Sequence, residues 1–366
     1  MRPERARAAA RGSSPLAEAI GASAAAHDAD GSFPAEAFAV LRRQGLVAAP
    51  PIAPAEIAAL LRLLAEVGRG DLSVARIFEG HVNARLLVDQ FGTAAQRRRF
   101  AGPEADALLG VWNTDAPGDP LRLVGGELVG RKNFASGVDG LDHAIVTVDG
   151  DGEAPARRMI LVPLAGLPVD RSWWTPMGMR ASGSHVVDFS GLRVEEDWHL
   201  GQPGDYLREP WFSAGAIRFL AAQVGGTHAL LDIAAEHLGQ AGRAANPHQA
   251  HRLARMGMAV ETGYLWLARA GADWARAART PDSEPARRLL AAANGARLAV
   301  ETAALAVLED AERAIGAQGM LAPHPFERRM RDLRVYLRQP NPDGAAAAFG
   351  AAIAAGDWAP GQGAGE

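Results

Sequence analysis

The C-terminal part of the chain contains four long stretches with helical periodicity, and this pattern constrains the fold more than any other feature. In the first stretch, apolar residues recur at the spacing of one helix face: Ile217, Leu220, Ala221 and Val224. Three further stretches follow, at 248–278, at 285–315 and from Phe326 onward. Four amphipathic helices of this length predict a four-helix bundle over residues 206–366, with a frayed tail rich in Gly and Ala.

Residues 108–205 show a different pattern, in which short β-type runs alternate with glycines. Five runs are rich in β-branched and other apolar residues: 121–124, 127–130, 144–148, 159–162 and 186–189. Gly125 and Gly126 form a two-residue hairpin signal between the first two runs. This pattern predicts a small β-barrel or sandwich.

The N-terminal third returns to helical spacing. Four residues there mark one apolar helix face: Ile57, Leu60, Leu61 and Leu64. Another helical stretch, 72–91, ends before Gly92. The sequence therefore predicts an α+β fold that is mostly α. Its three domains are an N-terminal helical domain (1–107), a small central β-barrel domain (108–205) and the C-terminal bundle (206–366).

Composition excludes several classes of function. The chain has no cysteine, which rules out disulfides and thiolate chemistry, and a formal net charge of −4 argues against a nucleic-acid partner. His248 and His251 lack the third ligand that a metal site needs, so no metal is expected. No apolar segment follows the arginine-rich stretch 1–11, and no apolar run reaches the roughly 20 residues of a membrane span. We therefore expect a cytoplasmic protein without a membrane partner.

Two local motifs are specific enough to suggest a family. Residues Met330, Arg331, Asp332 and Tyr336 follow a "Met-Arg-Asp-x-Arg/Lys-x-Tyr" pattern. The run 177–184 reads "Met-Gly-x-Arg-x-Ser-x-Ser". Together with the order of the three domains, these motifs resemble the acyl-CoA dehydrogenase superfamily, and the resemblance covers about residues 33–350.

This resemblance implies a flavin cofactor, which we expect to be FAD, with FMN possible in a monooxygenase-like member. Thr114 matches a threonine that contacts the flavin, and Phe134 and Ser136 match an aromatic residue on the ring and a hydroxyl near its reactive nitrogen. Arg180 and Ser184 match a region that borders the flavin and the substrate. Three of these residues have a plainer alternative: Thr114 as a strand-end residue, Phe134 as core and Arg180 as a structural ion-pair residue.

In the family the adenosine arm of the flavin lies across a dimer interface, so the resemblance also implies a homodimer or homotetramer. Arg243, Arg313 and Gly316 are the candidates for holding that arm. Arg313 replaces a family glutamine, and an arginine could pair with a pyrophosphate. Gly316 could equally be a helix C-cap.

The catalytic base of the family is missing. In relatives a glutamate in a "Tyr-Glu-Gly-Thr" loop removes the proton α to a thioester carbonyl. Four other residues fill this slot: Gln339, Pro340, Asn341 and Pro342. Neither an amide nor a proline can act as a general base. Some relatives place the glutamate before an arginine on the first bundle helix, but Ile217 precedes Arg218 here. Asp343 and Glu312 remain as substitutes, although an Asp before a Gly is also typical of a turn.

His81 is a second catalytic candidate, because the helix that carries it approaches the substrate cavity in relatives and a histidine can exchange protons near neutral pH. The alternative is a histidine bonded within the helix packing. The first hypothesis is thus an FAD-dependent, acyl-CoA dehydrogenase-like oxidoreductase acting on a CH-CH group of an acyl thioester, with an electron-acceptor flavoprotein as partner. The alternative is a monooxygenase or oxidase that receives reduced flavin from a flavin reductase, or a catalytically inactive relative.

Overall fold

The computed structural model describes residues 14–149, 157–279, 283–338 and 341–361. Its first part is helical, with these elements: α1 (Pro15–Gly21), α2 (Ala24–Asp30), α3 (Ala35–Arg43), α4 (Ile57–Gly70), α5 (Leu72–Phe91) and α6 (Ala94–Ala101). The Asp71 side chain accepts a hydrogen bond from the Val74 amide and so caps α5. Thr93 and Gln96 form a capping box at the start of α6.

The middle of the chain contains ten short strands among the described residues: β1 (Leu109–Trp112), β2 (Arg122–Val124), β3 (Glu127–Val129), β4 (Arg131–Ala135), β5 (His143–Val148), β6 (Arg158–Pro163), β7 (Val169–Asp170), β8 (His185–Asp188), β9 (Leu192–Arg193) and β10 (His199–Leu200). They form three small sheets with the orders β1-β5-β6-β10, β2-β3-β9 and β4-β8-β7. Gly125 and Gly126 both have positive φ and close the antiparallel hairpin of β2 and β3, as the sequence predicts. Closure of the sheets into a barrel stays a prediction.

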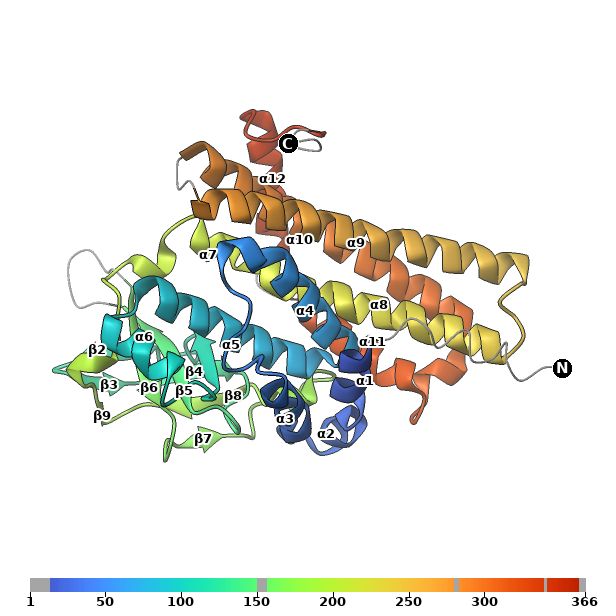
Figure 1. The fold of residues 1–366 in the computed structure, drawn as a ribbon. Helices are drawn as coiled ribbons and strands as arrows, with labels where there is room; N and C mark the ends of the chain where they lie inside the picture. The colour runs from blue at the N-terminus through green and yellow to red at the C-terminus, as the bar shows by residue number, and fades with distance from the viewer. Residues whose placement is uncertain (1–13, 150–156, 280–282, 339–340, 362–366) are drawn as a thin grey trace.

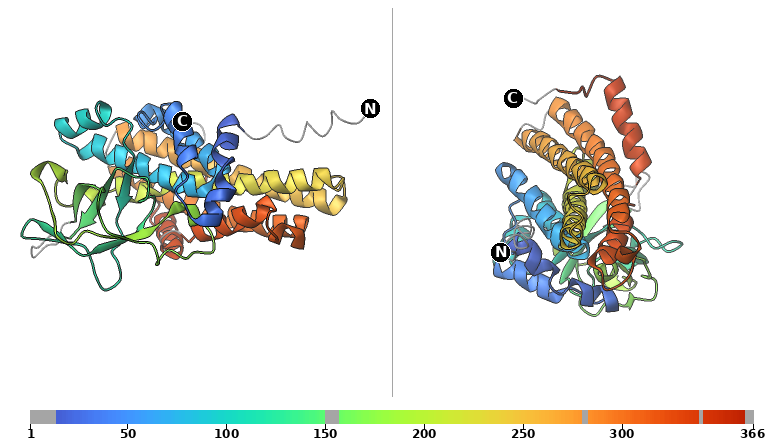
Figure 2. Two further views of the ribbon diagram at one scale, coloured as in Figure 1. Left: turned by 90° about the horizontal axis from the view of Figure 1, so that it is seen from below. Right: turned by 90° about the vertical axis from the view of Figure 1, so that its right-hand side faces the viewer.

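The last part is again helical: α7 (Trp211–Ala214), α8 (Ala216–Gln240), α9 (Pro247–Arg279), α10 (Ser283–Ile315), α11 (Pro325–Tyr336) and α12 (Pro342–Ala354). The long helices α8, α9 and α10 lie alongside one another, while the β-region lies beside α5 (Figures 1 and 2). The predicted mostly helical fold is confirmed. By length and composition α10 could cross a membrane. In this structure it packs against α8 and α9.

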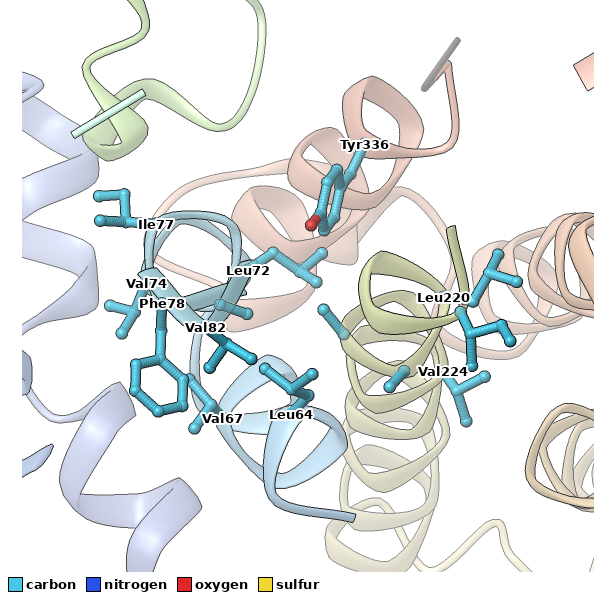
Figure 3. Packing of buried hydrophobic residues seen from close by; sticks show 14 of the residues in the cluster. Leu64, Val67, Leu72, Val74, Ile77, Phe78, Val82, Leu220, Val224 and Tyr336 are labelled. Carbon is cyan, nitrogen blue, oxygen red and sulfur yellow. The ribbon is translucent and has the colours of Figure 1, made fainter. Parts of the chain in front are cut away.

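The N-terminal helices α1–α6 join the C-terminal helix bundle of α8, α9 and α10 through a very close contact between α4 and α8. A Cβ on Gly68 would lie 2.3 Å from the Ala222 carbonyl oxygen, and one on Gly225 would lie 1.9 Å from the Ala65 oxygen. Neither position can therefore hold a larger residue without separating the helices. Around this contact the apolar side chains of α4, α5 and α8 form one continuous core (Figure 3).

Candidate active site

A cavity of about 1420 Å³ lies where the N-terminal helices, the β-region and the C-terminal bundle meet. Its wall combines residues from α5, the end of β1, the segment 205–219, α9, α10 and the end of α11. The wall is mainly apolar, with two polar groups of side chains. One group is on α5, α8 and α11, and the other lies just after β4 and in the segment before β8.

One face of α5 supplies much of the wall. Eight of its residues contribute. Asp89 and Phe91 do so at the C-terminal end of the helix, and the other six are Arg76, Glu79, Asn83, Leu86, Leu87 and Gln90. Their spacing of three, four, three, one and three residues is that of a single helix face. Asp71 fixes the first turn of the helix, and the buried residues of the opposite face fix its rotation.

Three polar residues of this wall form a hydrogen-bonded chain with Arg218 of α8. Arg76 Nη1 lies 2.7 Å from Glu79 Oε2, and Asn83 Nδ2 donates to Glu79 Oε1 at 2.5 Å. Arg218 Nε donates to Asn83 Oδ1, and its guanidinium lies 5.1 Å from the centre of the Trp274 ring. Burial lowers the pKa of Arg218 to about 10, although Glu79 opposes this shift, so Arg218 stays charged at neutral pH.

Tyr336, at the end of α11, adds a neutral donor to the same group. Its side chain extends toward α5 (Figure 3), and its hydroxyl is buried without a hydrogen-bond partner among the described residues. Burial, followed by the charge of Glu79, raises the pKa of Tyr336 well above its ordinary value. The hydroxyl therefore keeps its proton.

Three serine hydroxyls form the second polar group. Ser184 Oγ lies 2.8 Å from Ser136 Oγ and 2.9 Å from Ser182 Oγ, and all three residues line the cavity. Met179 and Gly183 have positive φ, 60° and 46°, on either side of a short turn at 180–182. This backbone turns Ser182 inward and leaves Arg180 exposed.

The two motifs that suggest the family meet directly behind these serines. Asp332 Oδ1 accepts a hydrogen bond of 2.6 Å from the Met179 amide, and Arg331 Nη1 donates to the Met177 oxygen at 2.6 Å. The "Met-Arg-Asp" helix therefore holds the serine-bearing loop in place. This contact explains physically why the two motifs occur together.

Aromatic rings lie beside the serines. Phe134 lines the cavity, and its side chain is 47% exposed. Its φ of 50° is strained for an L-residue and marks a site where the fold enforces an unusual backbone. The Trp173 and Trp174 rings contact it edge-on, at 4.9 Å and 6.1 Å. This arrangement excludes the plainer interpretation of Phe134 as a core residue.

Thr114 lies just after β1, exposed to the cavity. The backbone beneath it is held by Lys132, whose Nζ donates to the Asn113 oxygen at 3.1 Å and to Asp115 Oδ1 at 2.5 Å. Thr147 Oγ1 donates to Asn113 Oδ1 at 2.8 Å. The structure thus brings Thr114, Phe134, Ser136 and Ser184 to one cavity, and their roles in binding flavin or substrate stay predictions.

His81 does not reach this cavity. Its ring is fully buried, with Nε2 2.9 Å from the Val47 oxygen, and Nδ1 accepts a hydrogen bond from the Leu109 amide. Burial lowers its pKa to about 4. Both nitrogens of the neutral ring therefore hold α5 to its neighbours, and this geometry favours the packing alternative over a catalytic role.

The other catalytic and substrate-binding candidates lie outside the wall. Asp343 is exposed in the first turn of α12, and Glu312 is 2.5 Å from Arg334. Arg180 donates to the Ala29 oxygen at 3.2 Å. Gln339 and Pro340 of the vacant glutamate slot lie outside the described residues, and Ile217 is fully buried. Asp343, Glu312 and Arg180 therefore do not line the cavity in this arrangement.

The three candidates for the adenosine arm also lie away from the cavity. Arg243 is exposed after α8, Arg313 pairs with Glu309 at 2.5 Å, and Gly316 follows α10 with a φ of 81°. They lie at or just after the C-terminal ends of α8 and α10 and do not line the cavity, so their roles stay predictions that depend on a second copy.

Sequence reasoning missed the polar chain on α5. The signal was present, because Arg76, Glu79 and Asn83 are spaced three and four residues apart in a helix that is otherwise mostly apolar. Among the described residues, no group of three or more His, Asp or Glu could hold a metal ion.

Comparisons with known proteins indicate the same family as the two sequence motifs. The family "Acyl-CoA dehydrogenase, C-terminal domain" matches residues 218–338. L-evernosamine nitrososynthase of Micromonospora sp. is 30% identical, over 86% of this chain and 82% of its own length. Dibenzothiophene monooxygenase of Rhodococcus qingshengii is 24% identical over 75% of each chain.

Among solved structures, KijD3 in complex with FMN and dTDP-3-amino-2,3,6-trideoxy-4-keto-3-methyl-D-glucose has a TM-score of 0.76 and 26% identity. The match covers 99% of this chain and 96% of that one. The residues, the fold and these relatives agree: this chain belongs to the acyl-CoA dehydrogenase superfamily and lacks the family's usual catalytic glutamate.

Proposed function

We propose that this chain is a flavin-dependent monooxygenase that uses reduced FMN and O₂ to oxidise the amine nitrogen of a small organic molecule. Support comes from the relatives, which include a nitrososynthase, a monooxygenase and an FMN complex with an amino sugar nucleotide. They favour the oxygen-using alternative over the acyl thioester dehydrogenase that the sequence ranks first. FMN accordingly replaces FAD as the preferred cofactor.

The observation that carries the flavin part of this proposal is the serine group beside the Phe134 ring. A flavin is a flat aromatic ring with polar edges, and the wall offers an aromatic face together with the hydroxyls of Ser136 and Ser184. Thr114 adds another hydroxyl at the end of β1. These residues fit the ring: Phe134 and Trp174 would cover its face, and the serine hydroxyls would hydrogen-bond its polar edge.

A reduced flavin supplies two electrons, so that one oxygen atom of O₂ goes to the substrate nitrogen and the other leaves as water. This chemistry does not require a base for an α-carbon proton. The positions where relatives carry that base hold Ile217 and the slot 339–342. Glu79 does line the cavity, but it is engaged by Arg76 and Asn83. The arrangement therefore suits oxygenation better than dehydrogenation.

The relevant partner is a flavin reductase that delivers reduced flavin. An anaerobic titration with reduced and oxidised FMN, followed by addition of a panel of acyl-CoAs to the oxidised complex, tests the proposal. We expect reduced FMN to bind and the visible absorbance of the oxidised complex to stay unchanged with every thioester. Bleaching of the flavin band by an acyl-CoA would instead establish the dehydrogenase.

A further inference from the structure

We propose that Arg218 and Tyr336 bind an oxyanion, a carboxylate or a phosphate, on the substrate. This inference rests on the proposed function, because only that function makes the bound molecule a substrate. It assigns the polar group of α5, α8 and α11 as the recognition end of the cavity, and the serine group as the reactive end.

The charges of this polar group do not balance. Arg76 and Glu79 form an ion pair with each other. Arg218 makes no ion pair with any residue that the structure describes, and its Nε hydrogen-bonds a neutral amide. The group thus carries one unneutralised positive charge beside a largely apolar wall. A cation in such surroundings is stabilised strongly by an anion that enters from the cavity.

Asn83 fixes the orientation of Arg218. Its Nδ2 donates to Glu79 and its Oδ1 accepts from Arg218 Nε, so the reverse amide orientation would place donors against donors and an acceptor against an acceptor. The Trp274 ring supports the guanidinium at 5.1 Å. The terminal nitrogens of Arg218 therefore remain as the fork that can bind a carboxylate or phosphate through two hydrogen bonds.

Tyr336 gives independent support. A buried hydroxyl without a partner is unfavourable, and the free-energy cost disappears when an acceptor is supplied. Tyr336 lines the same cavity as Arg218, and both interact electrostatically with Glu79. An oxyanion accepts hydrogen bonds from both residues, whereas an ammonium group could accept from neither.

Three other charged residues of the wall already have partners. Arg208 lies 2.6 Å from Asp205, Arg338 pairs with Glu301, and Glu209 accepts from the Ser213 hydroxyl at 2.5 Å. Two further charged residues line the cavity: Asp89, which is exposed near the end of α5, and Arg297, which donates to the Asn341 oxygen at 3.3 Å. Arg218 is therefore the best site for an anionic substrate group.

The test compares three probes that differ only at one end: 6-aminohexanoate, 6-aminohexyl phosphate and neutral 6-aminohexanamide. Calorimetric titration of the FMN-loaded protein should show at least one anionic probe binding about tenfold more tightly than the amide, which corresponds to ~1.4 kcal/mol. The anionic probe that binds more tightly identifies carboxylate or phosphate as the preferred group. Equal affinity for all three probes would overturn the proposal.

Variants locate the effect. Arg218→Met should abolish the preference for the anionic probe, and Arg218→Lys should retain part of it. Arg180→Met, the same change at an arginine outside the cavity, should leave the preference intact. Tyr336→Phe should weaken anion binding several-fold while raising thermal stability, because it removes an unpaired buried hydroxyl. A preference that persists in Arg218→Met would contradict the assignment.

The phosphate of FMN is the competing occupant. If Arg218→Met weakens FMN binding but not riboflavin binding, and probe selectivity is unchanged, then the arginine serves the cofactor and the proposal is wrong. Probe binding requires no turnover. If the protein prefers the anionic probes but oxygenates no amine, the proposed function is wrong and the anion-binding role of Arg218 still holds.

Discussion

At the residue scale, the reactive end of the cavity depends on the hydroxyl of Ser184, which lies between those of Ser136 and Ser182. Removing it leaves the other two without their common partner. A hydrogen bond to a group that gains charge during a reaction is worth more than one between neutral groups. The proposed function therefore makes Ser184 more important for turnover than for folding.

Ser184→Ala should lower product formed per O₂ consumed by about tenfold, since a charge-assisted hydrogen bond contributes ~1.5 kcal/mol. Oxygen-electrode and product assays with a flavin reductase present measure this ratio. Ser172→Ala, at an exposed serine bonded to Asp170, is the matched control and should keep the wild-type ratio. Equal ratios for both variants would exclude a role for Ser184 in the reaction.

His81 makes stability depend on pH. Its pKa falls from about 6.5 to about 4 on folding because burial disfavours the charged ring, so the unfolded chain binds the proton more readily. The stability is complete above pH 6.5 and is lost as the pH falls toward 4, by up to ~3 kcal/mol. NMR titration of the His81 ring gives its pKa directly. A ring that titrates near 6.5 would show that the packing role is wrong.

The two residues Glu79 and His81 show where sequence reasoning succeeds and where it stops. The prediction that this helix approaches the cavity agrees with the structure, but the residue selected on it faces the other way. Two residues along a helix correspond to a rotation of about 200°. Because α5 is buried on most sides, its apolar pattern does not reveal which face meets the cavity.

At the element scale, the packing of α4 on α8 positions Arg218. Residues 65, 68, 222 and 225 are all Ala or Gly, which allows the helix backbones to approach closely. Periodicity alone predicts both helices well. It cannot predict that these two meet, because the contact joins residues about 150 positions apart and depends on the absence of side chains.

Gly225→Ala should destabilise the protein by about 2 kcal/mol or more, since its Cβ would overlap the Ala65 carbonyl. Gly239→Ala lies in the same helix with no atom within 4 Å of the new Cβ and should be neutral or stabilising, by up to ~1 kcal/mol. Urea unfolding of both variants measures the difference. Similar stabilities would mean that α4 and α8 are not packed this closely.

At the scale of the whole molecule, the cavity joins segments from all three parts of the chain. The order of those parts is readable from hydrophobic periodicity and the family motifs. The assembly of Glu79, Ser136, Arg218 and Tyr336 around one space is not readable, because it depends on tertiary packing. Family motifs could indicate Ser136 and Ser184, since they are local, whereas the unpaired charge of Arg218 requires the structure.

The expected homodimer or homotetramer has a candidate interface on the bundle. Four exposed apolar residues occur at seven-residue spacing on two neighbouring helices: Met258 and Leu265 on α9, and Leu298 and Leu305 on α10. A contiguous apolar patch on the surface marks an interface, and we expect these four residues to form one. Leu265→Arg combined with Leu298→Arg should shift the protein toward monomer in light scattering after size exclusion. Unchanged mass would place the interface elsewhere.

The central claim is that this chain transfers oxygen from O₂ with the help of reduced flavin. The most direct measurement supplies the protein with FMN, NADH, a free flavin reductase and ¹⁸O₂, together with a panel of small amines, amino acids and amino sugars, and analyses the products by mass spectrometry. We expect one ¹⁸O atom in an oxidised amine only when the protein is present, with much less in Ser184→Ala. No label in any product, together with anaerobic bleaching of bound flavin by an acyl-CoA, would contradict the account.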